Sequence, residues 1–153
     1  MTPLSPRQKK VLRVRGLLSA ALLLAASIGI ELALREGLGT PFGLAVAVAL
    51  ALGALLVFYT PERRYRSWAF LETEDELHIQ QGIWFKSRTV VPFGRVQHID
   101  VSQGPVERRY GVGTLTLHTA GTRGSSVTLP GLDHEDAERM RDGIRAKIRQ
   151  DLV

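Results

Sequence analysis

The chain contains no cysteine among its 153 residues. This absence excludes disulfides, cysteine-ligated zinc, iron–sulfur clusters and a thiol nucleophile. Charge is also missing, but only locally: residues 16–30 and residues 37–61 contain no charged side chain. The bilayer core requires about 20 apolar residues in helical form. The sequence therefore predicts two transmembrane helices, at about residues 14–35 and 40–60, in a membrane segment covering residues 1–61.

The chain after the second apolar run has almost no excess of positive charge. Residues 62–153 carry fourteen Lys and Arg against thirteen Asp and Glu, a net charge of +1. We therefore expect no nucleic-acid binding. The basic excess lies before the first apolar run, where anionic lipid attracts each cation by roughly 1 kcal/mol. The residues predicted to contact anionic lipid are Arg7, Lys9, Lys10, Arg13 and Arg15.

The distribution of Lys and Arg predicts the topology. Five cations precede the first span, three follow the second, and Arg35 alone lies in the connection. The positive-inside rule then places both termini in the cytoplasm. Gly37, Gly39 and Pro41 predict a short loop that closes a helical hairpin. Alternatively, the first segment could be a signal peptide with its small residues at 25–27.

Glu31 is the one acid inside the first span. An intramembrane acid is by default a functional candidate. Because Glu31 lies near the outer end, four residues before Arg35, we favour a structural ion pair between the two. Small residues in the second span predict close helix packing. Either the first span or a second copy of the protein could be the partner.

Residues 62–153 show the alternation of short β-strands separated by turns. Strand candidates are 68–71, 77–80, 83–91, 99–101, 115–117 and 127–129, with turns at Gly82, Gly104-Pro105 and Pro130-Gly131. Six or seven such strands predict an antiparallel barrel or sandwich. The last segment differs, because Ala137, Met140, Ile144, Ile148 and Leu152 form one helical stripe after an N-cap at Asp133. We expect this amphipathic helix to pack on the β core.

The histidines and glycines carry no clear catalytic signature. His98 and Asp100 are two apart on a strand and share a face, but no nucleophile is identifiable nearby. His134-Glu135 has no second His four residues on, so it is not the zinc-protease motif. Gly111-Val112-Gly113 precedes a strand and lacks the Lys of a phosphate loop, which favours a hairpin turn. We expect no catalysis, no metal and no cofactor.

One stretch carries a family resemblance. The run from Val91 to Gly121, followed by residues 129–132 and 136–144, resembles the bacterial pleckstrin-homology-type (PH) domain of YdbS-like membrane proteins, in which two transmembrane helices precede the domain. The shared pattern consists of Pro92, Arg95, Gln97, Gly104, Arg108, Gly111 and Gly113. The resemblance implies an α+β membrane protein of the bacterial cytoplasmic membrane: a two-helix hairpin, then a PH-like antiparallel β barrel or sandwich with a C-terminal helix.

The domain's basic residues are candidates for contacts with lipid or a partner. They are Lys86, Arg88, Arg95, Arg108 and Arg109, to which we add His98. Scattered charges of both signs are ordinary surface, so solvated salt bridges are the competing interpretation. Arg95 and Arg108 fall in the family-like pattern, where pairing with Asp100 or Glu107 would give them a structural role.

These observations predict a membrane-anchored PH-like module that acts as a protein-interaction scaffold or inner-leaflet sensor. Its expected partners are membrane lipids and a membrane protein, either a related tandem-PH protein or a second copy. The alternative is a subunit of an oligomeric transport or export assembly. An enzyme acting on lipid would require His98, Asp100 and Arg95 to converge in one cleft.

Overall fold

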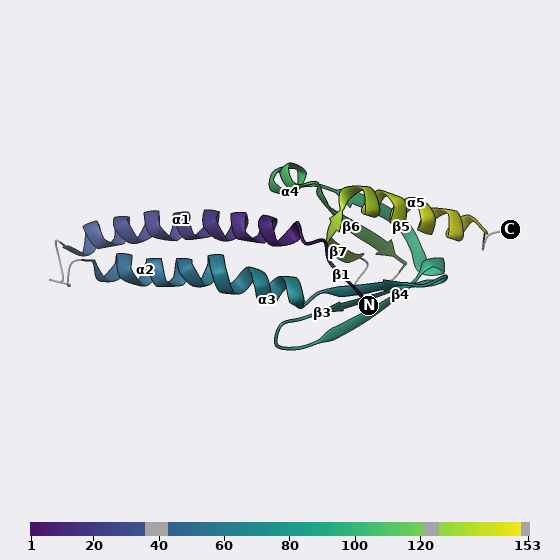
Figure 1. Cartoon of the computed structure of the whole chain (residues 1–153), viewed down its shortest axis with the longest axis horizontal. Coiled ribbons are helices and arrows are strands. Elements are labelled where there is room, and N and C mark those ends of the chain that lie inside the picture. Colours follow the sequence, from purple (N-terminus) through teal and green to yellow (C-terminus); the bar gives the residue numbers. More distant parts are fainter. Residues whose placement is uncertain (36–42, 121–125, 151–153) are drawn as a thin grey trace. The chain divides into compact units, whose positions relative to one another are not determined.

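The computed structural model describes residues 1–35, 43–120 and 126–150, except for the side chains of residues 34, 35 and 150 (Figure 1). The predicted loop with Gly37, Gly39 and Pro41, as well as Leu152, lies outside these residues. The chain divides into two compact units. One is a helical unit, Lys9–Arg63, and the other, here called the β domain, combines Met1–Gln8 with Arg64–Val153.

The helical unit follows from the two apolar runs. Helix α1 spans Gln8–Arg35, and α2 spans Leu44–Ala54. A π-helical turn, η1 (Leu55–Tyr59), continues into α3 (Thr60–Arg66). Two stretches, Gln8–Ala33 and Leu44–Arg66, are long and apolar enough to cross a bilayer. Large apolar side chains such as Leu18, Leu22 and Leu50 are exposed on them, which is the arrangement that lipid favours.

Small residues let the two helical runs approach closely. A Cβ on Gly16 would lie 2.6 Å from the carbonyl oxygen of Leu56, and one on Gly53 would lie 3.1 Å from the Cβ of Ala20. The first span is therefore one partner of the small-residue face of the second. Whether a second copy also packs there stays a prediction.

Glu31 makes a polar contact that its sequence position did not predict. Its Oε1 accepts a hydrogen bond from the backbone amide of Gly43, the residue that precedes α2. Amides at a helix start have no partner within the helix, so this contact gives Glu31 a structural role. The side chain of Arg35 lies outside the described atoms, and the predicted ion pair stays a prediction.

The β domain contains two antiparallel sheets. The first has the order β1 (Thr2–Pro3), β2 (Ala69–Glu72), β3 (Glu76–Gln81) and β4 (Ser87–Pro92), and a short 3-10 turn, η2 (Phe93–Arg95), follows it. The second has the order β5 (Val96–Ser102), β6 (Val112–Thr119) and β7 (Ser126–Asp133). Helix α4 (Pro105–Tyr110) connects β5 to β6, and α5 (His134–Gln150) ends the chain. The predicted α+β class is confirmed.

The core confirms the periodicities of the sequence. Leu77 and Ile79 of β3 and Leu115 and Leu117 of β6 are buried at alternate positions. From α5, Ala137 and Ile144 are fully buried, and Met140 and Ile148 pack beside them. The stripe of α5 therefore covers the β core as expected.

Several local predictions were wrong. The predicted turn at Pro130-Gly131 lies inside strand β7. The predicted strand over residues 83–91 begins only at Ser87, because residues 82–86 form the connection between β3 and β4. The predicted turn at Gly104-Pro105 is instead the start of α4, with Pro105 in its first turn. Glu107 Oε2 accepts the amide of Gly104 at 2.6 Å, which stabilises a helix too short to show a periodicity.

The glycine pair at 111 and 113 also has a different role from the predicted hairpin turn. Gly111 has a φ of +66° and ends α4 as its C-cap, a position where only glycine is free of steric cost. Gly113 lies in β6, where a Cβ would meet the ring of His134 at 3.3 Å. The first glycine thus ends a helix, and the second lets the start of α5 approach the sheet.

The N-terminal segment belongs to the β domain, although the sequence analysis grouped it with the membrane helices. Thr2 and Pro3 pair with Phe70 and Ala69 as strand β1. Leu4 is only 2% exposed and joins the hydrophobic core. The hydroxyl of Tyr65 donates to the carbonyl of Leu4 at 2.8 Å. The helical unit is therefore an insertion in the chain between strands β1 and β2.

Candidate functional site

A groove of about 430 Å³ lies between strand β5 and helix α5 of the β domain. Strand β5 pairs with β6 and has no strand on its other side within the sheets described. A bulge between Val96 and His98 leaves Gln97 without a partner in β6. An edge strand presents unpaired backbone groups to which another chain can bind. The groove is lined by Val96, Gln97, His98, Ile99, Arg141, Arg145, Ile148 and Arg149.

The α5 wall of the groove is basic because its arginines recur every four residues. Arg141, Arg145 and Arg149 therefore lie on one face of the helix. Arg141 binds two carboxylates, Glu138 at 2.7 Å and Asp142 at 2.9 Å. The hydrogen bond from Arg141, and to a smaller extent the charges of Arg141 and Arg145, lower the pKa of Asp142 below its ordinary value of 3.8.

The other two arginines differ from Arg141. Arg145 and Arg149 form no ion pair with any residue in the described part of the chain. Among the residues that the structure describes, no acid lines the groove. Ile99 and Ile148, both partly buried, provide apolar surface beside these charges. The groove is thus suited to an extended segment that carries acidic and apolar side chains.

A His–Asp–His cluster lies on the adjoining strands. Asp100 contacts His98 Nε2 at 2.8 Å through Oδ1 and His118 Nε2 at 3.1 Å through Oδ2. His98 and Asp100 thus meet on one face, as the strand spacing predicted. All three side chains are more than a third exposed. Arg95 lies in η2 and does not line the groove that His98 lines.

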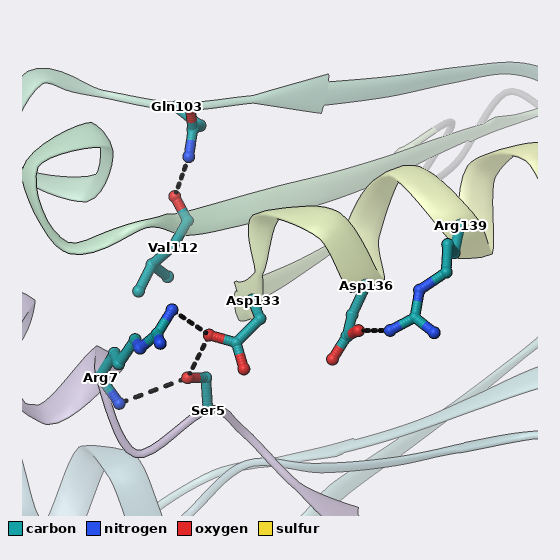
Figure 2. A network of polar contacts seen from close by, with 7 residues as sticks. All are labelled: Ser5, Arg7, Gln103, Val112, Asp133, Asp136 and Arg139. Atoms are coloured by element: carbon teal, nitrogen blue, oxygen red, sulfur yellow. Dashed lines mark hydrogen bonds and ion pairs between the residues drawn. The ribbon is translucent and has the colours of Figure 1, made fainter.

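A second polar site connects the N-terminal segment to the start of α5 (Figure 2). Ser5 Oγ donates to Asp133 Oδ1 at 3.0 Å, and Arg7 Nη1 donates to the same oxygen at 3.4 Å. The backbone amide of Ser5 donates to the carbonyl of Gly131 at 2.8 Å. Asp133 directly precedes α5, as predicted for an N-cap, but these contacts direct its carboxylate to the N-terminal segment. The network holds residues 5 and 7 in the β domain.

The structure distributes the predicted contact residues over separate elements. His98 lines the groove, whereas Arg108 lines a depression of about 450 Å³ beside Arg7 and Asp133. Arg109 is exposed on α4. Lys86 lies in the connection after β3, and Arg88 lies in β4. Their roles as contacts stay predictions, but they do not form one basic rim.

The cations predicted to contact anionic lipid are divided between the β domain and the helical unit. Arg7 lies in the β domain with Asp133 as its partner, and Lys9 Nζ binds Glu62 at 3.2 Å in the helical unit. Lys10, Arg13 and Arg15 lie along α1. Sequence reasoning did not select Arg145 and Arg149 as site residues. Their four-residue spacing was the available signal for a shared face.

Comparison with known proteins places the chain in a family. The model of the bacterial PH domain family matches residues 16–148. UPF0699 transmembrane protein YdbS of Bacillus subtilis (strain 168) is 35% identical over 155 residues, covering 98% of this chain and 95% of YdbS. UPF0699 transmembrane protein YdbT of the same organism is 25% identical over 105 residues, and the match spans only 21% of YdbT. No solved structure matches the chain significantly. The chain is therefore a transmembrane protein that belongs to the bacterial PH domain family, in the UPF0699 group that includes YdbS.

Proposed function

We propose that this protein is a cytoplasmically oriented, two-span membrane protein whose β domain is a non-catalytic protein-interaction scaffold. Its β5–α5 groove receives an extended acidic segment of a membrane-protein partner. The observation that carries this proposal is the basic groove beside an edge strand. Membrane tethering raises the local concentration of such a partner, so a weak contact becomes effective.

The chain topology supports an even number of membrane crossings. Residues before α1 and residues after α3 belong to one β domain, which supports placing both ends of the helical unit on one side of the bilayer. Cleavage of a signal peptide after residues 25–27 would remove β1 and the buried Leu4 from the domain. The excess of Lys and Arg at those two ends indicates the cytoplasmic side.

Cysteine labelling tests this topology cleanly, because the natural chain has no cysteine. We expect the Ser102→Cys variant, altered in the β domain, to react with a membrane-impermeant maleimide only after permeabilisation. The Leu44→Cys variant, altered at the exposed start of α2, should react in intact cells. Labelling of Ser102→Cys in intact cells would reverse the proposed orientation.

A peptide-binding measurement tests the groove. The probe is a fluorescent ten-residue peptide of alternating Glu and Val, titrated into the full chain in nanodiscs. Main-chain pairing at a sheet edge with side-chain selection is an established mode of recognition. We expect the double variant Arg145→Glu/Arg149→Glu to weaken binding about tenfold, which corresponds to ~1.4 kcal/mol.

The matched control is Arg139→Glu, on the same helix but outside the groove and paired with Asp136. Arg139→Glu lowers the net charge by two units and the double variant lowers it by four, so general attraction alone predicts about half the effect of the double variant on the binding free energy. Equal weakening by Arg139→Glu, or no effect of the double variant, would refute the groove as the binding site.

The partner is proposed from the family relationship. A longer relative of the YdbT kind shares sequence with this chain over only a fifth of its own length, which leaves most of that relative available for other contacts. Co-expression of this chain with such a relative, or with a differently tagged second copy, should give a complex in mild detergent. The Arg145→Glu/Arg149→Glu change should disrupt the complex, and Arg139→Glu should not.

A further inference from the structure

The connection between β3 and β4 exposes three large apolar side chains in a row. Ile83 is 40% exposed, Trp84 84% and Phe85 90%. These three residues, here called the aromatic tip, contribute nothing to the hydrophobic core. Gly82 begins the connection with a φ of +125°. The position requires glycine, because a side chain there would collide with the Phe85 carbonyl. The fold thus holds two aromatic rings out of the domain.

The strand register places the aromatic tip at a particular end of the sheet. Pro3 pairs with Ala69, Ala69 with Gln80, and Gln80 with Arg88. All four residues therefore lie at the end from which the 82–86 connection protrudes. At this same end the chain leaves β1 toward α1 and enters β2 after α3. The aromatic tip thus projects from the sheet end that is covalently linked to both membrane-spanning runs.

Two cations follow the aromatic tip in sequence. Lys86 and Arg88 are both exposed, and neither forms an ion pair with a residue whose position is described. Tryptophan favours the boundary between lipid headgroups and acyl chains. Lysine and arginine near an anionic leaflet are attracted to its headgroups. Aromatic rings followed by cations therefore match the chemistry of a membrane surface.

We propose that the aromatic tip inserts into the interface of the bilayer that anchors the chain, with Lys86 and Arg88 on anionic headgroups. This contact gives the β domain a third membrane attachment, in addition to its two covalent links. It is independent of the β5–α5 groove, which uses other residues. The insertion makes the attachment of the β domain sensitive to the anionic lipid content of the leaflet.

Fluorescence quenching tests the insertion. The Trp68→Phe variant of the full chain retains Trp84 alone and is reconstituted into vesicles of phosphatidylethanolamine and phosphatidylglycerol with brominated acyl chains. We expect these lipids to quench Trp84. The control is Trp68→Phe/Trp84→Phe/Glu74→Trp, which moves the reporter to the exposed β2–β3 turn at the opposite sheet end. Its tryptophan should not be quenched.

A charge variant tests the role of the cations. Lys86→Glu/Arg88→Glu, made in the Trp68→Phe variant, should lower the quenching in anionic vesicles and leave it unchanged in brominated phosphatidylcholine alone. Both side chains are exposed, so the domain should unfold at the same temperature as before.

Two outcomes would overturn the proposal. The first is equal quenching of Trp84 and of the control tryptophan. The second is a Trp84 that is shielded from acrylamide but is not quenched by brominated lipid. In this outcome, Trp84 would also become accessible to acrylamide when the protein-to-lipid ratio of the vesicles is lowered. That result would mean that a second copy of the protein covers the aromatic tip. Neither outcome affects peptide binding at the groove, so the two proposals fail separately.

Discussion

The Leu4→Ala variant tests whether the segment before the first membrane helix is part of the β core. The Leu4 side chain is 2% exposed and packs within 3.1 Å of the site of a Cβ on Gly131. Truncation removes three carbons, worth about 0.8 kcal/mol each, and leaves a cavity. We expect a loss of about 2.5–4 kcal/mol in the free energy of unfolding.

The loss should be visible as a lower melting temperature of the β domain. In a domain of roughly 100 residues, 1 kcal/mol shifts Tm by about 4–8 °C, so Leu4→Ala should lower Tm by at least about 10 °C. The assay is thermal unfolding of the full chain in detergent, followed by Trp68 fluorescence in a Trp84→Phe variant. Trp68 packs against the core and therefore reports on it.

The matched control is Leu71→Ala in β2. Leu71 lies in the same domain but is 40% exposed, so its truncation should cost less than about 1 kcal/mol. If Leu4→Ala melted within the same few degrees as Leu71→Ala, the N-terminal segment would not be a structural part of the domain. The inference of an even number of crossings would then lose its support.

Three further substitutions test other contacts. Gly16→Leu should separate α1 from η1, because a side chain there collides with the Leu56 carbonyl. Disulfide trapping between cysteines introduced next to Gly16 and Leu56 measures this separation. It should fall in Gly16→Leu but not in the control Gly29→Leu, because a Cβ on Gly29 has nothing within 4 Å. Glu107→Ala should destabilise the β domain by about 1–3 kcal/mol, since it leaves the Gly104 amide without the carboxylate that caps α4; chemical denaturation measures this, and an unchanged midpoint would contradict it. Asp142→Asn should strengthen acidic-peptide binding at the groove, because it leaves Arg141 with one carboxylate instead of two, whereas weaker binding would count against charge attraction.

The elements readable from the sequence were those with a sustained local pattern. Two apolar runs of spanning length identified the membrane helices. Alternation located β3, β5, β6 and β7 to within a few residues, and a helical stripe located α5. Each pattern repeats several times within its own segment, so one irregular residue does not hide it. The family resemblance on residues 91–144 has the same local origin, and it was confirmed.

Short elements had no such signal. Strand β1 consists of two residues, and α4 of six, too few to show a period. Ile83, Trp84 and Phe85 were included in the predicted strand over residues 83–91, and such aromatic and β-branched residues do favour strands. They instead follow Gly82, which has a positive φ, in the connection between β3 and β4, and only the folded chain shows that these side chains are exposed.

By itself, the sequence determined that this is a membrane protein with two apolar spans, a β domain and a terminal amphipathic helix, because each is encoded by neighbouring residues. The tertiary structure alone decided that Met1–Gln8 completes the domain that resumes at Arg64. It also decided that Arg145 and Arg149 face the edge of β5, and that an aromatic tip lies at the end of the sheet linked to the membrane helices. The bond between Ser5 and Asp133, for example, joins residues 128 positions apart, and pairings over such separations depend on the whole fold.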